Sequence, residues 1–264
     1  MKLPSLPTSI KNPQRYIRDS NFGISQKVDG HRLLIKVQER KLVGYNRQGD
    51  RRPVPTTLNV LTRLPGTWWF DGELIKGEYY IFDLLQTPQG DTTGLPFEER
   101  DSILRNVLSV QRPALHYLPT HTQNKEEFFE YCQKTRTEGV VFKRLDAPYL
   151  QGRSKKQLKF KFVHTIDCIV TNSRLDDKDN LEIGLMSNGQ IVNCGRVSAL
   201  TGDGPKVNVG DVVEVTYLYT SKERHLYQPV RPKIRTDKKP EDCTVDQLEL
   251  TYPSQKIIGE LWQI

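Results

Sequence analysis

Apolar and β-branched residues occur in short runs along the first part of the chain, and Asp, Asn, Gly and Pro separate these runs. Short runs bounded by turn residues are typical of β-strands. The pattern predicts strands at residues 22–28, 31–38, 41–45, 67–75, 79–85, 139–143 and 157–163. Asp29 and Gly30 lie between the first two runs, and an Asp-Gly pair in that position predicts a β-hairpin.

Two stretches in the same region have helical periodicity instead. The first has apolar residues close to the spacing of one helix face, at Phe97, Ile103, Leu104, Val107 and Leu108. The second begins after Asn124, where Asn-Lys-Glu-Glu resembles a capping box with Asn in the place of Ser or Thr. We therefore predict two helices within a domain that consists mostly of strands.

From about residue 164 onward, the pattern contains strands alone. Runs at residues 166–174, 181–186, 191–195 and 212–219 are separated by Asp, Asn and Gly turns. This density of strands is expected of a small Greek-key barrel. We predict two domains, an α+β domain at residues 1–164 and an all-β domain at residues 165–264.

The balance of charged residues indicates a class of binding partner. The 264 residues include 39 Lys and Arg against 32 Asp and Glu, a formal net charge of +7. A basic chain favours a polyanionic partner, although charge alone does not identify it. The four cysteines are widely spaced and form no Cys-x-x-Cys pair, so neither a zinc ribbon nor a disulfide framework is predicted.

No apolar run approaches the ~20 residues that a membrane span needs, so we predict no membrane association. Pro4 and Pro7 interrupt the N-terminal stretch before a secretion signal could form. We expect a cytoplasmic protein that is not secreted, and that is associated with the nucleoid if the source is bacterial.

Charged and aromatic residues stand at the ends of several predicted strands. They occur in five stretches, which read KVDGHR at 27–32, FDGEL at 70–74, YIFDLL at 80–85, EGVVFK at 138–143 and LKFKF at 158–162. In a strand, the alternation in the last stretch puts Lys159 and Lys161 on one face. Two ammonium groups side by side repel each other unless an anion lies between them, which indicates a phosphate site. Taken singly, a solvated strand face explains these lysines equally well, and a surface lysine before a turn explains Lys27.

In this order, the five stretches resemble the motifs of the covalent nucleotidyltransferase superfamily, which comprises ATP-dependent DNA ligases, RNA ligases and mRNA capping enzymes. Two further stretches, YNRQG at 45–49 and DAPYLQGRS at 146–154, are similar to those of DNA ligases in particular. The stretch IRTDKKP at 234–240 is similar to the RxDK element in the C-terminal barrel of ligases and capping enzymes. The chain therefore resembles an ATP-dependent DNA ligase in a minimal two-domain form. It departs from the ligase pattern at Gln157, where an aromatic residue is common.

The resemblance implies a fold and an activity. The fold would be a nucleotidyltransferase domain of ATP-grasp-like antiparallel sheets with helices, followed by an OB-fold barrel. The activity would be the sealing of 3′-OH/5′-phosphate nicks in duplex DNA, in replication or repair, through a lysyl-AMP and an adenylylated DNA. ATP and Mg²⁺, for which Mn²⁺ could substitute, would be required, and nicked DNA would be bound by a monomer.

The resemblance also implies roles for individual residues. Lys27 would be the nucleophile, and Asp29, Lys159 and Lys161 would complete the catalytic set. Phe82 would stack on adenine. The nucleotide-binding residues would be Gln26, Lys27, Arg32, Glu73, Phe82, Glu138, Lys143, Lys159 and Lys161. The metal ligands would be Glu73, Glu138 and Asp29. The residues that contact DNA would be Arg32, Arg47 and Arg153. The barrel element that assists adenylylation would consist of Arg235, Asp237 and Lys238.

Three alternatives remain open from the sequence. An RNA ligase or a GTP-dependent mRNA capping enzyme would share the superfamily motifs. A non-catalytic OB-type protein would bind nucleic acid without forming a covalent adduct. The nucleotide that labels the chain, if any, separates these possibilities.

Overall fold

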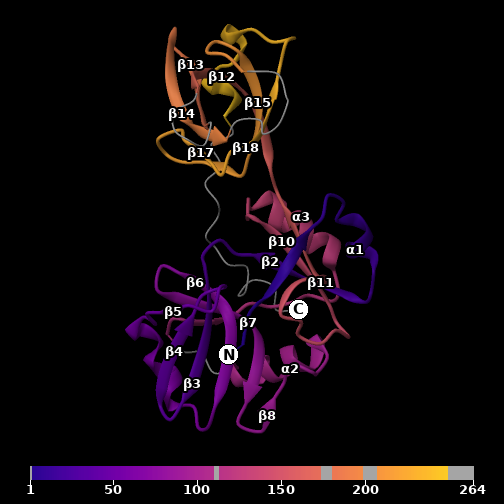
Figure 1. Ribbon diagram of the computed structural model, residues 1–264. Helices are drawn as coiled ribbons and strands as arrows, with labels where there is room; N and C mark the ends of the chain where they lie inside the picture. The colour runs from indigo at the N-terminus through magenta and orange to yellow at the C-terminus, as the bar shows by residue number, and fades with distance from the viewer. Residues whose placement is uncertain (1, 110–112, 174–179, 199–206, 249–264) are drawn as a thin grey trace. The chain divides into compact units, whose positions relative to one another are not determined.

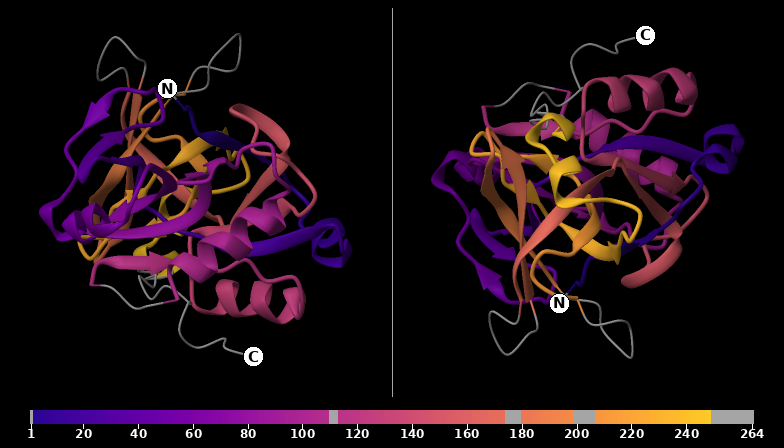
Figure 2. Two further views of the ribbon diagram at one scale, coloured as in Figure 1. Left: turned by 90° about the horizontal axis from the view of Figure 1, so that it is seen from below. Right: turned by 90° about the horizontal axis from the view of Figure 1, so that it is seen from above.

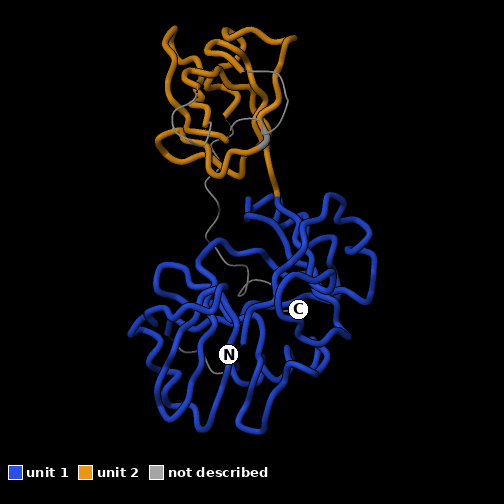
Figure 3. The backbone as a smooth tube through the Cα atoms, in the orientation of Figure 1, with its two compact units in different colours: residues 1–161, 254–264 blue, residues 162–253 orange. Residues whose placement is uncertain are grey.

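The computed structural model describes residues 2–109, 113–173, 180–198 and 207–248. It divides them into two compact units, residues 1–161 and residues 162–253 as far as these are described (Figure 3). The C-terminal residues 249–264, which the sequence assigns to the second domain, lie outside the described part. No helix in the described ranges combines the length and the apolar character needed to cross a membrane.

A four-stranded sheet forms one half of the first unit. Its strands, in spatial order, are β1 (Ser5–Ser9), β11 (Gly152–Lys161), β10 (Gly139–Arg144) and β2 (Phe22–Lys27). The β1 strand runs parallel to β11, and the other neighbours are antiparallel. Two helices, α1 (Gln14–Arg18) and α3 (Lys125–Lys134), contact each other and pack against this sheet (Figures 1 and 2).

The two faces of β10 have different roles. Val140 and Phe142 are fully buried, and the Phe142 ring centroid lies 5.8 Å from that of Tyr16 in α1. Side chains alternate between faces along a strand, so Val141 and Lys143 lie on the face turned away from the helices. That face is the one available for a site.

A larger sheet forms the other half of the first unit. Its strand order is β5 (Arg51–Arg52), β4 (Lys41–Tyr45), β3 (His31–Gln38), β6 (Trp68–Ile75), β7 (Glu78–Thr87) and β8 (Gly90–Asp91), and β9 (Leu115–Tyr117) pairs with β7 in parallel. The helix α2 (Phe97–Val107) packs on β7, and the 3-10 helix η1 (Thr56–Arg63) contacts β3, β4 and β7. Buried apolar residues of these elements form one core, which includes Leu33, Ile35, Leu58, Phe70, Ile81 and Leu104.

A bulge in β7 changes the direction of one side chain. Ile81 pairs with Gly72 and Asp83 pairs with Asp71, so Phe82 is the extra residue between them. Bulges of this kind redirect side chains next to functional sites. The bulge brings Phe82 to the wall of a pocket that is described below.

The predicted hairpin at Asp29-Gly30 is wrong. The flanking strands β2 and β3 lie in different sheets, and neither turn residue has the positive φ that a type I′ hairpin turn requires. A Cβ on Gly30 would lie 2.6 Å from the carbonyl oxygen of Leu74. Glycine at this position therefore allows the chain to pass close to β6 while it crosses from one sheet to the other.

The two predicted helices are confirmed as α2 and α3, but the predicted capping box is wrong. Asn124 has the left-handed conformation, with φ of 48°, and its side chain makes no capping hydrogen bond. A capping side chain needs an extended backbone at that residue. The sequence patterns also did not predict β1, α1 and η1. Pro7 lies within β1, and an edge strand is a position where a sheet tolerates proline.

The described part of the second unit contains strands and two short 3-10 helices. Its five-stranded antiparallel sheet has the order β14 (Gln190–Ser198), β13 (Asn180–Ser187), β12 (His164–Ser173), β15 (Val212–Tyr217) and β18 (Val230–Ile234). The outermost strands, β14 and β18, also contact each other, so the sheet curls toward closure. A hairpin of β16 (Tyr219–Thr220) and β17 (Leu226–Tyr227) and the helices η2 (Pro240–Asp242) and η3 (Val245–Gln247) complete the described part.

Candidate nucleotide-binding site

A pocket opens in the first unit between its two sheets. Six of the residues that the sequence assigns to nucleotide binding line it: Gln26, Lys27, Arg32, Glu73, Phe82 and Lys143. The remaining lining residues include Pro7 of β1, Val141 of β10 and Gln157 of β11. The pocket therefore takes side chains from both sheets and from the N-terminal strand.

Strand register explains why three lysines gather on one face of the four-stranded sheet. Gly139 of β10 pairs with Lys27 on one side and with Lys161 on the other. One step along the sheet, Val141 pairs with Lys159. Paired residues point to the same face of a sheet, so Lys27, Lys159 and Lys161 project from neighbouring rows toward the same side.

Glu138 connects two of these lysines. Its carboxylate, of which 3% is exposed, contacts the Lys27 ammonium, and its other oxygen lies 2.8 Å from Lys161 Nζ. Burial and the nearby charges of Lys27 and Lys161 lower the pKa of Lys159 below its ordinary value. The cluster therefore holds three cations against one carboxylate, and this excess of positive charge suits a phosphate group.

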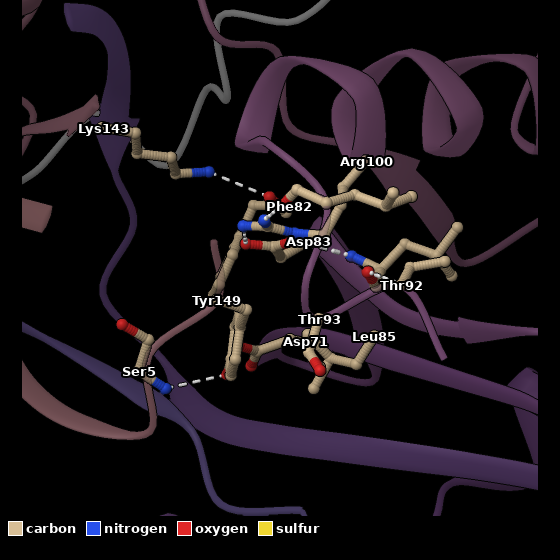
Figure 4. Close-up of polar contacts among 12 residues, drawn as sticks. Ser5, Asp71, Phe82, Asp83, Leu85, Thr92, Thr93, Arg100, Lys143 and Tyr149 are labelled. Atoms are coloured by element: carbon tan, nitrogen blue, oxygen red, sulfur yellow. Dashed lines mark hydrogen bonds and ion pairs between the residues drawn. The ribbon is translucent and has the colours of Figure 1, made fainter. Parts of the chain in front are cut away.

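The other end of the pocket is aromatic and cationic. The Arg32 guanidinium carbon lies 4.6 Å from the Phe82 ring centroid, and Lys143 Nζ lies 5.1 Å from the same ring. Lys143 also donates a hydrogen bond to the Phe82 carbonyl oxygen at 2.9 Å (Figure 4). Burial lowers the pKa of Lys143 to about 8, although Asp83, Asp101 and Asp71 act in the opposite direction.

Arg32 is held by a buried carboxylate. Its Nε and Nη2 atoms donate to the two oxygens of Asp71 at 2.5 and 2.6 Å. Asp71 is fully buried, and it also accepts a hydrogen bond of 2.6 Å from the Tyr149 hydroxyl. A bidentate ion pair of this kind fixes the orientation of the guanidinium plane.

A second buried ion pair lies behind Phe82. Arg100 of α2 donates to both oxygens of Asp83, at 2.7 and 3.0 Å, and both side chains are 1% exposed (Figure 4). The remaining Nη1 atom donates to the carbonyl oxygens of Leu95 and Ala147. This ion pair joins α2, β7 and the loop before β11, and so it supports the bulge at Phe82.

Glu73 has the most perturbed carboxyl group at the pocket. Burial raises its pKa to about 7, despite the nearby charges of Arg32 and Lys27. Asp71 and Glu138 act in the same direction as burial. Glu73 can therefore exchange a proton near neutral pH, which is a property common at functional sites.

Six predicted site residues of the first unit lie outside the pocket lining, namely Glu138, Lys159, Lys161, Asp29, Arg47 and Arg153. Asp29 is exposed between β2 and β3, and Arg47 is exposed in the turn between β4 and β5. Arg153 is exposed on β11, close enough to Lys159 to influence its pKa. Among the described residues, no group of three or more His, Cys, Asp or Glu side chains is arranged to hold a metal ion.

The predicted barrel residues lie in the second unit. Arg235 follows β18 and donates to Asp237 at 2.8 Å through both Nε and Nη2. Its Nη1 atom lies 3.0 Å from Asp167 and 3.2 Å from Glu214. These bonds lower the pKa of Asp237 well below its ordinary value. Lys238 is exposed beside them.

Sequence reasoning missed the residues that hold Arg32. Asp71 lies two positions before Glu73, and an acid within the apolar run of β6 was a signal that it is buried and paired. Tyr149 gave no such signal, because nothing in the sequence shows that its loop reaches β6. The contribution of Pro7 depends on the pairing of β1 with β11, which is a contact between distant parts of the chain.

Comparison with known proteins finds a family that part of this chain is similar to. Residues 70–161 match the family model for the ATP dependent DNA ligase domain. The resemblance to ATP-dependent DNA ligases that the sequence motifs carry is thereby confirmed.

One curated relative of this chain is also a DNA ligase. DNA ligase C2 of Mycolicibacterium smegmatis is 31% identical over 135 residues, which are 48% of this chain and 38% of that protein. The chain thus spans less than half the length of this curated relative.

Two solved structures have a similar fold. A mycobacterial DNA ligase D complexed with ATP and MES is 21% identical, with a TM-score of 0.56 over 92% of this chain and 97% of that one. A Lig E DNA ligase, described as binding DNA with a minimal scaffold, is 16% identical, with a TM-score of 0.65 over 89% of this chain and 100% of that one. At these identities the likeness concerns the fold, which combines mixed sheets with few helices.

Proposed function

We propose that this chain is an ATP-dependent DNA ligase that forms a covalent lysyl-AMP on Lys27 and seals 3′-OH/5′-phosphate nicks in duplex DNA. The observation that carries the proposal is the position of Lys27, which lines the pocket in contact with Glu138. Lys161 and Lys159 lie in the neighbouring rows of the same sheet face. The proposed nucleophile and an aromatic wall thus line one pocket, and the proposed phosphate-binding lysines lie beside Lys27 on the same sheet face.

The first step is a substitution at the α-phosphorus of ATP. Neutral Lys27 Nζ attacks this phosphorus, the Nζ–P bond forms, and the bond to the bridging oxygen of pyrophosphate breaks. Pyrophosphate leaves with the electron pair of that bond. The proton that Nζ must lose passes to Glu138, whose carboxylate is in contact with Nζ.

Lys159 and Lys161 stabilise the negative charge of the transferring phosphoryl group. Positioning and electrostatic stabilisation supply most of the catalysis in phosphoryl transfer. Glu138 neutralises part of the positive charge of the lysines by pairing with Lys161 and Lys27. A bound phosphate competes with Glu138 for these ammonium groups, which frees the carboxylate to accept the proton.

Phe82 is the proposed stacking partner of adenine, and Arg32, Lys143 and Gln26 surround the nucleoside. All four residues line the pocket. The ATP bound to the related ligase D supports ATP as the nucleotide for this fold.

Magnesium would join the site together with the nucleotide, because the described carboxylates are not arranged to hold a metal ion by themselves. Mg²⁺ is commonly held by one or two carboxylates together with substrate phosphates. Glu138 and Glu73 lie close enough to influence each other, and Asp29 follows Lys27 by two residues. These three residues are the proposed ligands, and the ion would supply neutralisation of the phosphate charge.

The two units have separate proposed roles. We assign residues 1–164 to the nucleotidyltransferase domain and residues 165–264 to an OB-fold domain. The support for the second is a curled five-stranded antiparallel sheet, the architecture of OB folds. Arg235, Asp237 and Lys238 would assist adenylylation, while Arg47 and Arg153, together with Arg32, would contact DNA phosphates.

Intact mass after incubation with Mg²⁺ and ATP tests the proposal directly. The wild-type chain should gain one AMP after pre-treatment with pyrophosphate, which removes any AMP already bound. Lys27→Ala should gain none. Lys41→Ala, which changes an exposed lysine of β4, is the matched control and should react like the wild type. An adduct on Lys27→Ala, or none on the wild type, would contradict the mechanism.

The same assay separates the alternatives. Labelling by GTP in place of ATP would identify a capping enzyme. An ATP adduct with sealing of RNA alone would identify an RNA ligase. Binding of nicked DNA without any adduct would identify a non-catalytic protein. The DNA ligase proposal requires an ATP adduct and sealing of nicked duplex DNA by the monomer.

A further inference from the structure

The N-terminal strand β1 contributes its backbone to the surroundings of Arg32. The Ser5 carbonyl oxygen accepts a hydrogen bond of 3.1 Å from Arg32 Nη2. The Ser5 backbone N–H donates to the Tyr149 hydroxyl at 2.8 Å (Figure 4). Ser5 thus makes two polar contacts with segments far away in sequence.

Tyr149 closes these contacts into a ring. Its hydroxyl accepts from Ser5 and donates to Asp71, and Asp71 holds the Arg32 guanidinium through two hydrogen bonds. Ser5, Asp71 and Tyr149 are 1%, 0% and 6% exposed. Each contact is therefore shielded from water, and the loss of one leaves buried polar groups without a partner.

Burial beside Asp71 raises the pKa of the Tyr149 hydroxyl well above its ordinary value. The hydroxyl keeps its proton and remains a donor to Asp71 at any pH at which the enzyme would work. Asp71 alone would fix the guanidinium plane, but Tyr149 also holds Asp71, and the Ser5 carbonyl oxygen accepts from the same Nη2 atom that donates to Asp71. The ring therefore determines where Arg32 stands over Phe82.

We propose that Tyr149, together with the backbone of Ser5, is a positioning residue that sets Arg32 for the nucleotide, so that strand β1 is a working part of the nucleotide site. The inference rests on the proposed function, because the nucleotide is the ligand that Arg32 would meet. Pro7 of β1, which lines the same pocket, is consistent with this role.

The chain offers a matched control for a purely structural role. The Tyr117 hydroxyl also donates to a buried carboxylate, with 2.9 and 2.8 Å to the two oxygens of Asp101. Neither Tyr117 nor Asp101 lines the pocket. Tyr149→Phe and Tyr117→Phe therefore remove the same chemical group from similar surroundings in the same unit.

The experiment measures the rate of lysyl-AMP formation against ATP concentration, together with denaturant unfolding, for the full-length chain and both variants. Tyr149→Phe should raise the ATP concentration for the half-maximal rate by about tenfold, as expected when a hydrogen bond in a charged network is lost. Tyr117→Phe should leave that concentration unchanged while it lowers stability to a similar extent. Equal effects of the two variants on ATP would overturn the proposal.

A double-mutant cycle tests whether Tyr149 acts through Arg32. Arg32→Lys keeps the positive charge but loses the fork that Asp71 holds. If Tyr149 acts by positioning Arg32, Tyr149→Phe should have little further effect on the ATP dependence in the Arg32→Lys background. If the effects of the two substitutions on the ATP concentration for the half-maximal rate multiply fully, Tyr149 and Arg32 act independently and the inference is refuted.

Ser5→Pro provides a second route if Tyr149→Phe fails to fold. It removes the N–H that reaches Tyr149 and leaves the tyrosine in place, and it should produce the same shift in ATP dependence. An unchanged ATP dependence of Ser5→Pro would contradict the proposal that the hydrogen-bonded ring positions Arg32. A wild-type chain that forms no adduct would defeat the proposed function, whereas a reactive wild type with a normal Tyr149→Phe would defeat the inference alone.

Discussion

Glu73 is the residue whose ionisation should be most visible in the behaviour of the folded chain. Burial raises its pKa from 4.5 to about 7. Between these two pH values the folded chain holds a proton that the unfolded chain has released. The free energy of unfolding therefore falls as pH rises from 4.5 to 7, and this contribution is constant outside that window.

Glu73→Gln should remove this dependence, because glutamine does not titrate. Relative to the variant, the wild type should lose on the order of 1–3 kcal/mol of stability between pH 4.5 and 8. Urea unfolding of both chains at pH 4.5, 6 and 8 measures the difference. A wild type that gains stability relative to Glu73→Gln over this range would show that Glu73 is ionised in the folded chain well below neutral pH.

At the scale of elements, the site depends on how closely β10 approaches β11. Gly139 pairs with Lys161 and with Lys27, and a Cβ at this position would lie 2.1 Å from the Phe160 carbonyl oxygen. Any side chain at residue 139 must therefore push β11 away from β10. The strand that would move carries Lys159 and Lys161, the two lysines proposed to bind phosphate.

Gly139→Ala should lower the rate of lysyl-AMP formation by at least about tenfold, since a displacement of about 1 Å at a reacting group can cost more than that. It should also lower stability by about 1–3 kcal/mol through overpacking. Gly94→Ala is the control, because a Cβ at Gly94 would meet nothing within 4 Å. Adduct formation by Gly139→Ala at the control rate would mean that β11 tolerates the shift.

The elements also show what could be predicted from the sequence. Apolar periodicity located α2 and α3 and most strands correctly, because it reflects which faces are buried. The hairpin prediction at Asp29-Gly30 failed, because β2 and β3 pair with strands of different sheets despite the local turn signal between them. Apolar periodicity also failed at β1, whose pairing with β11 leaves no local trace.

The candidate site was predictable to a similar extent. Motif order identified Lys27, Glu73 and Phe82, and all three line the pocket. Asp71, Tyr149 and Ser5 were not assigned a role, because their importance comes from hydrogen bonds across distant segments. The residues proposed to touch the nucleotide could be recognised by type and order, whereas the residues proposed to orient them depend on the tertiary structure.

At the scale of the whole molecule, the net charge of +7 has a measurable consequence for the proposed DNA substrate. Each phosphate contact contributes about −0.9 to the slope of log affinity against log salt concentration. With about four such contacts, affinity for nicked duplex DNA should fall about 100-fold between ~50 and ~200 mM salt. Electrophoretic mobility shift measurements over this range test the slope.

Adenylylation by ATP alone provides the internal comparison. It involves a small ligand in a partly enclosed pocket, so its rate should change much less over the same range of salt. DNA affinity that is flat with salt would contradict the view that the excess cations bind the nucleic-acid backbone.

The parallel pairing of β1 with β11 also has a consequence for biosynthesis. Ser5 leaves the ribosome well before its partner Gly152 and the loop with Tyr149, which lie far downstream in the sequence. Contacts between such distant segments form late, after the chain between them has folded. Strand β1 is made before the segments it pairs with and is thus among the last to dock. Under the proposed function, a nascent chain can capture its nucleotide only when nearly the whole first unit has been made.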